Sequence, residues 1–183
     1  MTKDHYSQQN KYKRIYSFGV IFLSEWIGIF CFLNGTGIPG DGRCLFRSVV
    51  HGACLREGKP SPSEGLEKCL ADELRDKVAD EFIKRRRDTE WFLEDDFDTY
   101  VMQMRQPHVW GGEPELLMSS HVLKMPITVF MRDKKRGNLK VVAEYGQEYG
   151  MENPIRVLYH GYGHYDALGS LIIGAKSKPC KKR

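Results

Sequence analysis

Hydrophobic residues recur every four positions along one part of this chain, the spacing expected of a helix with one buried face. The run just before it, Ser61-Pro62-Ser63-Glu64, combines an N-cap, a first-turn proline and a capping-box acid. We therefore predict a long helix that starts with Ser61 as its N-cap and has a solvated basic end at 84–87. The apolar stripe is assigned to the core and comprises Leu66, Leu70, Leu74, Val78 and Phe82.

Three further helices are predicted around this long one. A helical run at 44–56 follows the glycine-rich loop 37–42. Pro107 stops a second helix, and Pro126 ends a third at 113–123, because proline cannot continue a helix. The second helix is recognised by the apolar residues Phe97, Tyr100, Val101 and Met104.

Short β-rich runs follow Pro126, at 127–131, 139–145 and 155–160, with turn residues between them. Helices come first in the sequence and strands afterwards. This order predicts an α+β fold in which helices pack on a mostly antiparallel β-sheet.

The N-terminal part has a different composition. Residues 1–14 are polar and basic, whereas 15–33 are almost wholly apolar and reach the length of a membrane-spanning helix. A buried or irregular segment of a soluble protein, a membrane anchor and a cleaved signal peptide all remain open for 15–33. We divide the chain into an N-terminal segment (1–37), a folded domain (38–170) and a basic tail (171–183).

The length of the chain limits the number of domains, and its charge bears on whether nucleic acid is a partner. The 183 residues suffice for one domain, and the net charge of +4 arises from the tail. A short basic terminus is usually solvated, so nucleic acid is not predicted as a partner. The basic residues concerned are Lys176, Lys178, Lys181, Lys182 and Arg183.

The cysteines have neither the spacing of a zinc site nor that of a disulfide framework. We predict no metal and no cofactor, and we expect a reducing, cytoplasmic location with at least one free thiol. A membrane-anchored chain with a cytosolic domain is the alternative location. The five cysteines are Cys31, Cys44, Cys54, Cys69 and Cys180.

One of these thiols stands where chemistry is favoured. Cys44 lies at the point where the glycine-rich loop becomes a helix, and the partial positive charge of a helix N-terminus favours thiolate. Gly40 and Gly42 permit unusual backbone angles that turn N–H groups toward a developing oxyanion. The alternative is that Cys44 is a small buried hydrophobic residue.

A partner for the thiol is found near the end of the domain. His164 and Asp166 are two residues apart on a predicted strand, so both side chains face the same side. The carboxylate would then orient the imidazole for cysteine–histidine catalysis, unless the histidine merely caps a polar strand end. A zinc pair of His160 and His164 is not expected, because intervening glycines break helical geometry.

Together, these segments resemble the ovarian-tumour (OTU) family of cysteine proteases over about 38–168. The matching segments are Asp-Gly-x-Cys at 41–44, Trp-Gly-Gly at 110–112 and His-Tyr-Asp at 164–166. The resemblance implies a papain-like α+β fold and no metal. It also implies hydrolysis of isopeptide bonds that join ubiquitin to lysine side chains or to other ubiquitins.

The resemblance also assigns roles. It implies that Cys44 is the nucleophile, His164 the general base and Asp166 the orienting acid. Asp41 matches an active-site position, where it would hold the oxyanion loop or act as a helix cap. Whether Asp41 or Asp166 is the principal acid partner of the histidine stays open. Trp110, Gly111 and Gly112 match a segment near the substrate channel, or else form a core residue and a turn.

The expected partners are ubiquitin, polyubiquitin chains and ubiquitinated proteins. Two alternatives belong to other classes: a catalytically silent ubiquitin-binding module, and a membrane-tethered adaptor in which 15–33 is the functional part. The presence of all three expected catalytic residue types argues against the silent module.

Overall fold

The computed structural model describes residues 36–93, 96–133 and 137–169. The apolar segment 15–33 and the tail 171–183 lie outside these ranges, so their interpretation stays a prediction. Within the described ranges, no helix is both long enough and apolar enough to cross a membrane.

The helices lie close to where the sequence pattern places them. The bounds of α2 and α6 agree with the predicted ones, and Pro107 follows α5 as expected. Two short turns of helix after α3 were not predicted. In chain order the helices are α2 (Cys44–Arg56), α3 (Glu64–Lys84), α4 (Arg86–Thr89), η1 (Glu90–Phe92), α5 (Phe97–Met104) and α6 (Glu113–Leu123).

The long helix α3 differs from the prediction at its start. Ser63 is the N-cap, and its side chain accepts a hydrogen bond from the Leu66 N–H, so Ser61 lies outside the helix. Leu74, Val78 and Phe82 are buried as predicted, but Leu66 is 52% exposed. A spacing of four exceeds the 3.6 residues of a helical turn, so the stripe rotates progressively away from the core.

The strands form one four-stranded sheet in the order β2-β1-β3-β4. Two of its pairings, β1 with β2 and β3 with β4, are antiparallel, which confirms the prediction of a mostly antiparallel sheet. The central pairing of β1 with β3 is parallel and was not foreseen. The strands are β1 (Ile127–Arg132), β2 (Leu139–Tyr145), β3 (Ile155–Tyr159) and β4 (Tyr165–Ala167), with a short helix η2 (Gln147–Tyr149) before β3.

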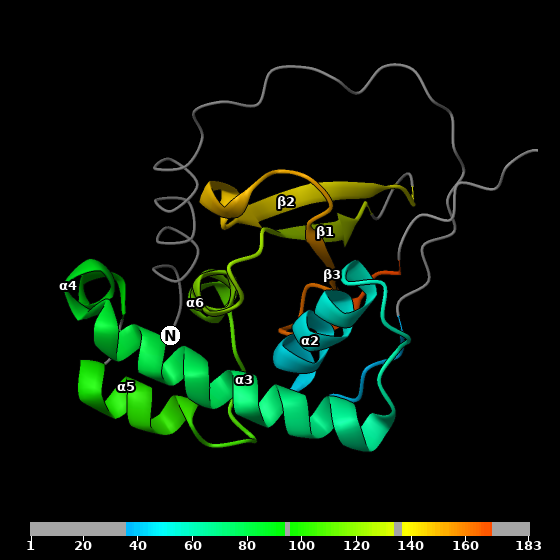
Figure 1. Cartoon of the computed structure of the whole chain (residues 1–183). Helices are drawn as coiled ribbons and strands as arrows, with labels where there is room; N and C mark the ends of the chain where they lie inside the picture. The colour runs from blue at the N-terminus through cyan, green and yellow to red at the C-terminus, as the bar shows by residue number, and fades with distance from the viewer. Residues whose placement is uncertain (1–35, 94–95, 134–136, 170–183) are drawn as a thin grey trace, which may run out of the picture. The chain divides into compact units, whose positions relative to one another are not determined.

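Two helices lie between the sheet and α3 (Figure 1). Helix α2 contacts β3 and β4, α6 contacts β2, and α3 packs on both helices as well as on α5. Helix α2 is therefore held on two sides, and its buried face fixes the position of its first residue, Cys44. The α2 residues in the core are Cys44, Leu45, Phe46, Val49 and Val50.

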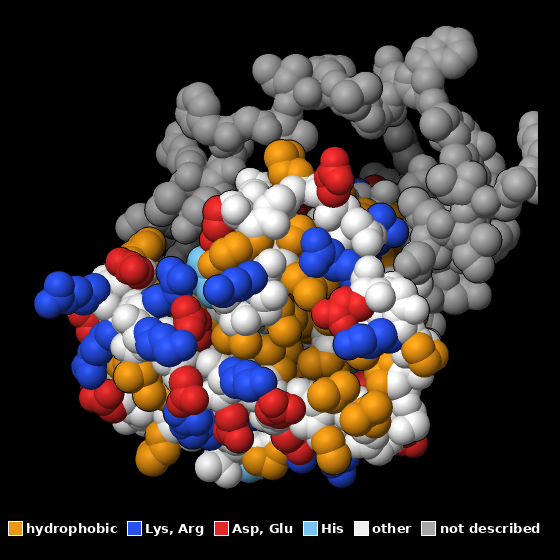
Figure 2. Space-filling view, viewed as in Figure 1, with side chains coloured by type: hydrophobic (Ala, Val, Ile, Leu, Met, Phe, Trp, Pro, Cys, Tyr) orange, Lys and Arg blue, Asp and Glu red, His pale blue; other side chains and the backbone are white. Residues whose placement is uncertain are grey.

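Acidic and basic side chains are interspersed over the face shown in Figure 2, including the lower part where α3 and α5 lie. Lys77 pairs with Glu73 at 2.6 Å, and Arg105 pairs with Asp80 at 2.5 Å. This face therefore presents no continuous field of one sign. The prediction that nucleic acid is not a partner remains untested.

Candidate active site

Cys44 is the first residue of α2 and is almost fully buried. The loop before it turns at Gly42, which has a φ of +84°. A Cβ atom at Gly42 would lie 2.5 Å from the backbone carbon of His108, so only glycine fits there. Gly40 has no such φ, so the sequence argument about unusual backbone angles applies to Gly42 alone.

Arg75, from the middle of α3, ties this loop to the one that follows α5. Its Nη2 donates to the Gly42 carbonyl at 2.7 Å and to the Pro107 carbonyl at 3.3 Å, while Nη1 donates to the Met104 carbonyl at 2.9 Å. The guanidinium is buried and lies 4.4 Å from the ring centre of Phe46. A rigid fork of donors thus holds two loops in fixed relation.

The Asp41 side chain bonds the backbone of its own loop and does not contact the histidine through any hydrogen bond of the described structure. Its Oδ1 accepts the Arg43 N–H at 3.1 Å, and its Oδ2 lies 3.3 Å from Arg47 Nη1. Arg47 in turn bonds the buried Glu67 at 2.7 Å, and Glu67 also meets His51 at 2.8 Å. Asp41 is therefore anchored by a buried polar network behind the N-terminus of α2.

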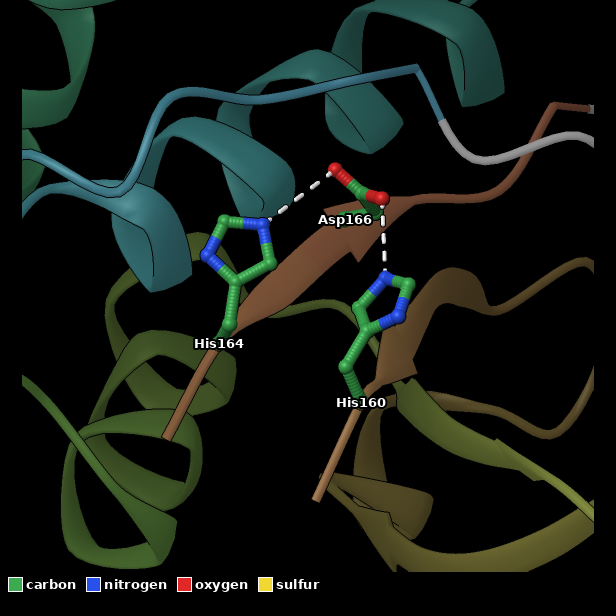
Figure 3. A group of neighbouring side chains, drawn as sticks. All are labelled: His160, His164 and Asp166. Atoms are coloured by element: carbon green, nitrogen blue, oxygen red, sulfur yellow. Dashed lines mark hydrogen bonds and ion pairs between the residues drawn. The ribbon is translucent and has the colours of Figure 1, made fainter. Parts of the chain in front are cut away.

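Asp166 is the acid that meets the imidazole. Its Oδ1 lies 3.7 Å from His164 Nε2 and accepts the Ile38 N–H at 2.8 Å. Its Oδ2 lies 2.9 Å from the Nε2 of a second histidine, His160. The two imidazoles flank one carboxylate, as Figure 3 shows.

The register of the terminal hairpin explains this arrangement. Strands β3 and β4 pair Tyr159 with Tyr165, and the His160 N–H donates to the His164 carbonyl at 3.0 Å. His160 and His164 are thus opposite one another, one residue after the end of β3 and one residue before the start of β4. Asp166 follows His164 by two residues on the same face, so it is also the diagonal neighbour of His160.

The thiol of Cys44 has a different neighbour from the one expected. Its Sγ lies 3.7 Å from the Gly163 carbonyl, and among the described residues no hydrogen bond joins Cys44 to His164. Burial raises the pKa of the Cys44 thiol above its ordinary value of 9.0, the charge of Asp41 adds to this, and backbone N–H groups oppose it. The predicted lowering of the pKa by the helix N-terminus is therefore outweighed by desolvation.

The Trp-Gly-Gly segment lies at the edge of this site. Trp110 is 46% exposed, and Cβ atoms at Gly40 and Gly163 would lie 3.8 Å and 3.2 Å from its ring. Trp110 is therefore a wall of the site and not a core residue. Beside it, a Cβ at Gly111 would lie 3.3 Å from Leu45 Cδ1, so this glycine allows α2 to approach closely.

Gly112 has a structural partner that the sequence motif did not reveal. Its N–H donates to Glu115 Oε2 at 2.6 Å, and the other carboxylate oxygen accepts from Tyr100. Glu115 is fully buried, and burial raises the pKa of its carboxyl. Gly112 thus serves as the N-cap of α6 within a buried polar cluster.

Three residues of this site were missed by sequence reasoning: His160, Arg75 and Glu115. His160 was considered only as a helical partner of His164, although its place at the end of a strand run was a usable signal. Glu115 lies three residues after the glycine pair, which is capping-box spacing. Arg75 carries no local signal, because its partners come from two distant loops.

The sequence of this chain is similar to those of known cysteine proteases. A family model described as OTU-like cysteine protease matches residues 39–166. Over 132 residues the chain is 73% identical to the ovarian tumor domain-containing deubiquitinating enzyme 4 of Arabidopsis thaliana, covering 72% of this chain and 42% of that protein. It is 30% identical over 154 residues to deubiquitinating enzyme 3 of the same plant, covering 72% of this chain and 65% of that one.

Solved structures show the same fold. The OTU domain of OTUD1 aligns with a TM-score of 0.56 at 24% identity, covering 73% of this chain and 82% of that one. An OTU domain in complex with ubiquitin aligns with a TM-score of 0.53 at 20% identity, covering 74% and 69%. The family match and the 73% identity together show that this chain belongs to the OTU family of cysteine proteases.

Proposed function

We propose that this chain is a thiol-dependent deubiquitinase that hydrolyses isopeptide bonds between ubiquitin and lysine side chains, including those of other ubiquitins. The observation that carries the proposal is the His164–Asp166 pair beside a cysteine at a helix N-terminus. The two Arabidopsis relatives are named deubiquitinating enzymes, and one structurally similar OTU domain was solved in complex with ubiquitin. The chain spans only 42% of the length of the first relative. The activity of that relative therefore applies to this chain only as part of the proposal.

The proposed reaction has two steps. The Cys44 thiol gives its proton to His164, and the thiolate attacks the carbonyl carbon of the isopeptide bond. His164 returns that proton to the lysine nitrogen, the C–N bond breaks, and a thioester remains on Cys44. A water molecule, deprotonated by His164, then attacks the thioester and releases the ubiquitin carboxylate and the free thiol.

Asp166 would orient the imidazole in this scheme, because it faces Nε2 and leaves Nδ1 for the thiol. The backbone N–H groups of the loop 40–44 would stabilise the oxyanion, with Asp41 holding the loop and Arg75 fixing it from behind. Trp110, Gly111 and Gly112 would line the channel for the ubiquitin tail. In the described structure Cys44 faces Gly163, so binding of the tail has to bring thiol and imidazole together.

An electrophilic ubiquitin probe tests the proposal. We expect the probe to label Cys44, and we expect Cys44→Ala to abolish cleavage of diubiquitin while thermal unfolding stays near that of the parent chain. Cys54→Ala is the matched control, because Cys54 also lies in α2 but is half-buried and distant from the start of the helix. Labelling of Cys54, or cleavage by the Cys44→Ala variant, would refute the assignment.

We also propose a cytoplasmic location, with a membrane anchor at 15–33 as the alternative. Cys44, Cys54 and Cys69 are free thiols in the described part of the chain, which fits a reducing compartment. Extraction of membranes with alkaline carbonate distinguishes the two, since only an anchored chain stays in the pellet.

A further inference from the structure

We propose that His160, His164 and Asp166 form a binding site for a divalent transition-metal ion, most favourably Zn²⁺. Binding of this ion inhibits the enzyme reversibly. Each of the three offers one ligand atom, and these atoms lie within 4.8 Å of one another. Two imidazoles and one carboxylate are a donor set that zinc accepts, with a water in the fourth position. This site is independent of the thiol that usually explains metal inhibition of cysteine enzymes.

The distances suit one ion. Ligand atoms at about 2.1 Å from a tetrahedral zinc stand about 3.4 Å apart. In the structure, Asp166 Oδ2 lies 2.9 Å from His160 Nε2, and Asp166 Oδ1 lies 3.7 Å from His164 Nε2. The ring centres of the two histidines are 5.4 Å apart. The three ligand atoms lie within 4.8 Å of one another, so a movement of at most about 1.4 Å along the widest separation brings them onto one ion. Figure 3 shows both rings directed at the same carboxylate.

The surroundings favour a fixed site with an entry path. The Asp166 side chain is 9% exposed, and the Ile38 N–H holds its Oδ1, so the carboxylate is oriented in advance as metal ligands usually are. The side chains of His160 and His164 are 42% and 26% exposed, so an ion can reach them from solvent. Asp166 forms the base of the site and the histidines form its rim.

Inhibition follows from the chemistry of imidazole. A neutral imidazole that binds a metal through Nε2 carries its proton on Nδ1. His164 would then have no lone pair on Nδ1 to receive a proton from Cys44 or from the water that resolves the thioester. The metal-bound form and the catalytic tautomer are mutually exclusive. This consequence rests on the proposed role of His164, whereas the binding itself does not.

Binding is tested first on the full chain with Cys44→Ala, which removes the thiol of the active site. We expect Co²⁺ to bind with one-to-one stoichiometry and to give the visible absorption of a four-coordinate ion, without a thiolate charge-transfer band. Zn²⁺ should displace it, and calorimetry should give the affinity. His160→Gln should weaken binding at least about 10-fold, since even loss of a residue that only supports a metal ligand costs 10- to 100-fold.

His121→Gln is the matched control, because His121 lies on α6 with its Nδ1 2.9 Å from Tyr149 Oη, away from the three ligands. It should bind cobalt like the parent. Paramagnetic shifts of the histidine ring protons on the Co²⁺-loaded protein identify the ligands without any substitution at His160. Shifts confined to other histidines, or equal binding by His160→Gln, would overturn the site.

Inhibition is then measured on the active chain with diubiquitin. Zn²⁺ should suppress cleavage and a chelator should restore it, and His160→Gln should need at least about 10-fold more zinc for half-inhibition relative to its own zinc-free rate. Equal sensitivity of His160→Gln and the parent would contradict the regulatory part. A chain that binds cobalt at the three ligands but never cleaves ubiquitin would instead refute the proposed function and leave the site standing.

Discussion

The two acids of the active site have different partners, and their removal should have different effects. Asp166 faces His164, whereas Asp41 holds the backbone of the loop through Arg43. We expect Asp166→Asn to slow both diubiquitin cleavage and reaction with a ubiquitin that carries an alkyl halide. Asp41→Ala should spare the alkylation, which forms no oxyanion, and lower cleavage about 100-fold, as loss of an oxyanion donor does.

Measuring both rates for both variants separates the roles. The charge of Asp41 raises the pKa of Cys44, so its removal gives no reason for slower alkylation. If Asp41→Ala slowed alkylation and Asp166→Asn did not, the two acids would have exchanged roles.

Burial of Cys44 predicts how its reactivity depends on pH without ubiquitin. Because the pKa of the thiol lies above 9.0, only the small thiolate fraction reacts at neutral pH. The rate of alkylation by iodoacetamide at Cys44 should rise about tenfold per pH unit from pH 6 to 8 without a plateau. Mass spectrometry of the Cys44 peptide gives this rate, with exposed Cys69 as internal reference. A plateau below pH 7 would indicate a thiolate–imidazolium pair at rest.

Between elements, Arg75 is the residue on which the geometry of the site depends. Arg75→Met keeps the apolar bulk over Phe46 but leaves the carbonyls of Gly42, Pro107 and Met104 without their donor. Each buried orphan acceptor costs about 1–3 kcal/mol. Part of this cost is offset, because the substitution also removes a buried cation whose Nε has no hydrogen-bond partner in the described structure, so we expect a net loss of about 2–4 kcal/mol in urea unfolding. Cleavage should fall more than alkylation by the ubiquitin alkyl halide, because the oxyanion loop loosens.

Lys77 provides the control for Arg75, because it lies on the same helix but forms only an exposed ion pair. Lys77→Met removes a surface ion pair with Glu73 and should change stability by less than about 1 kcal/mol. Equal loss of stability in both variants would show that Arg75 does not hold the loops.

For the whole molecule, the core of the described domain is built from residues between Ile38 and Leu168. We therefore expect a chain lacking residues 1–33 to fold and to retain cleavage within about twofold of the full chain, which corresponds to about 0.4 kcal/mol. Circular dichroism and diubiquitin cleavage check this. Loss of cooperative unfolding in the shortened chain would show that the apolar segment belongs to the core.

Local signals in the sequence determined most of the secondary structure and the α+β class. Prolines follow α5 and α6, and short β-rich runs separated by turn residues mark the strands, because these signals act within a few residues. The motifs around Cys44, Trp110 and His164 sufficed to identify the family. An apolar stripe with a spacing of four does not stay on one face of a helix that turns every 3.6 residues, and Leu66 at its start is therefore exposed.

Only the tertiary structure decided what surrounds each reactive group. The Ile38 N–H that orients Asp166 lies 128 residues away from it in sequence, and the Gly42 and Pro107 carbonyls that hold Arg75 come from two separate loops. His160 joins the site through strand register, and the pKa of Cys44 rises because the fold removes water from it. Burial and long-range contacts are properties of packing, and a local pattern of residues does not encode them by itself.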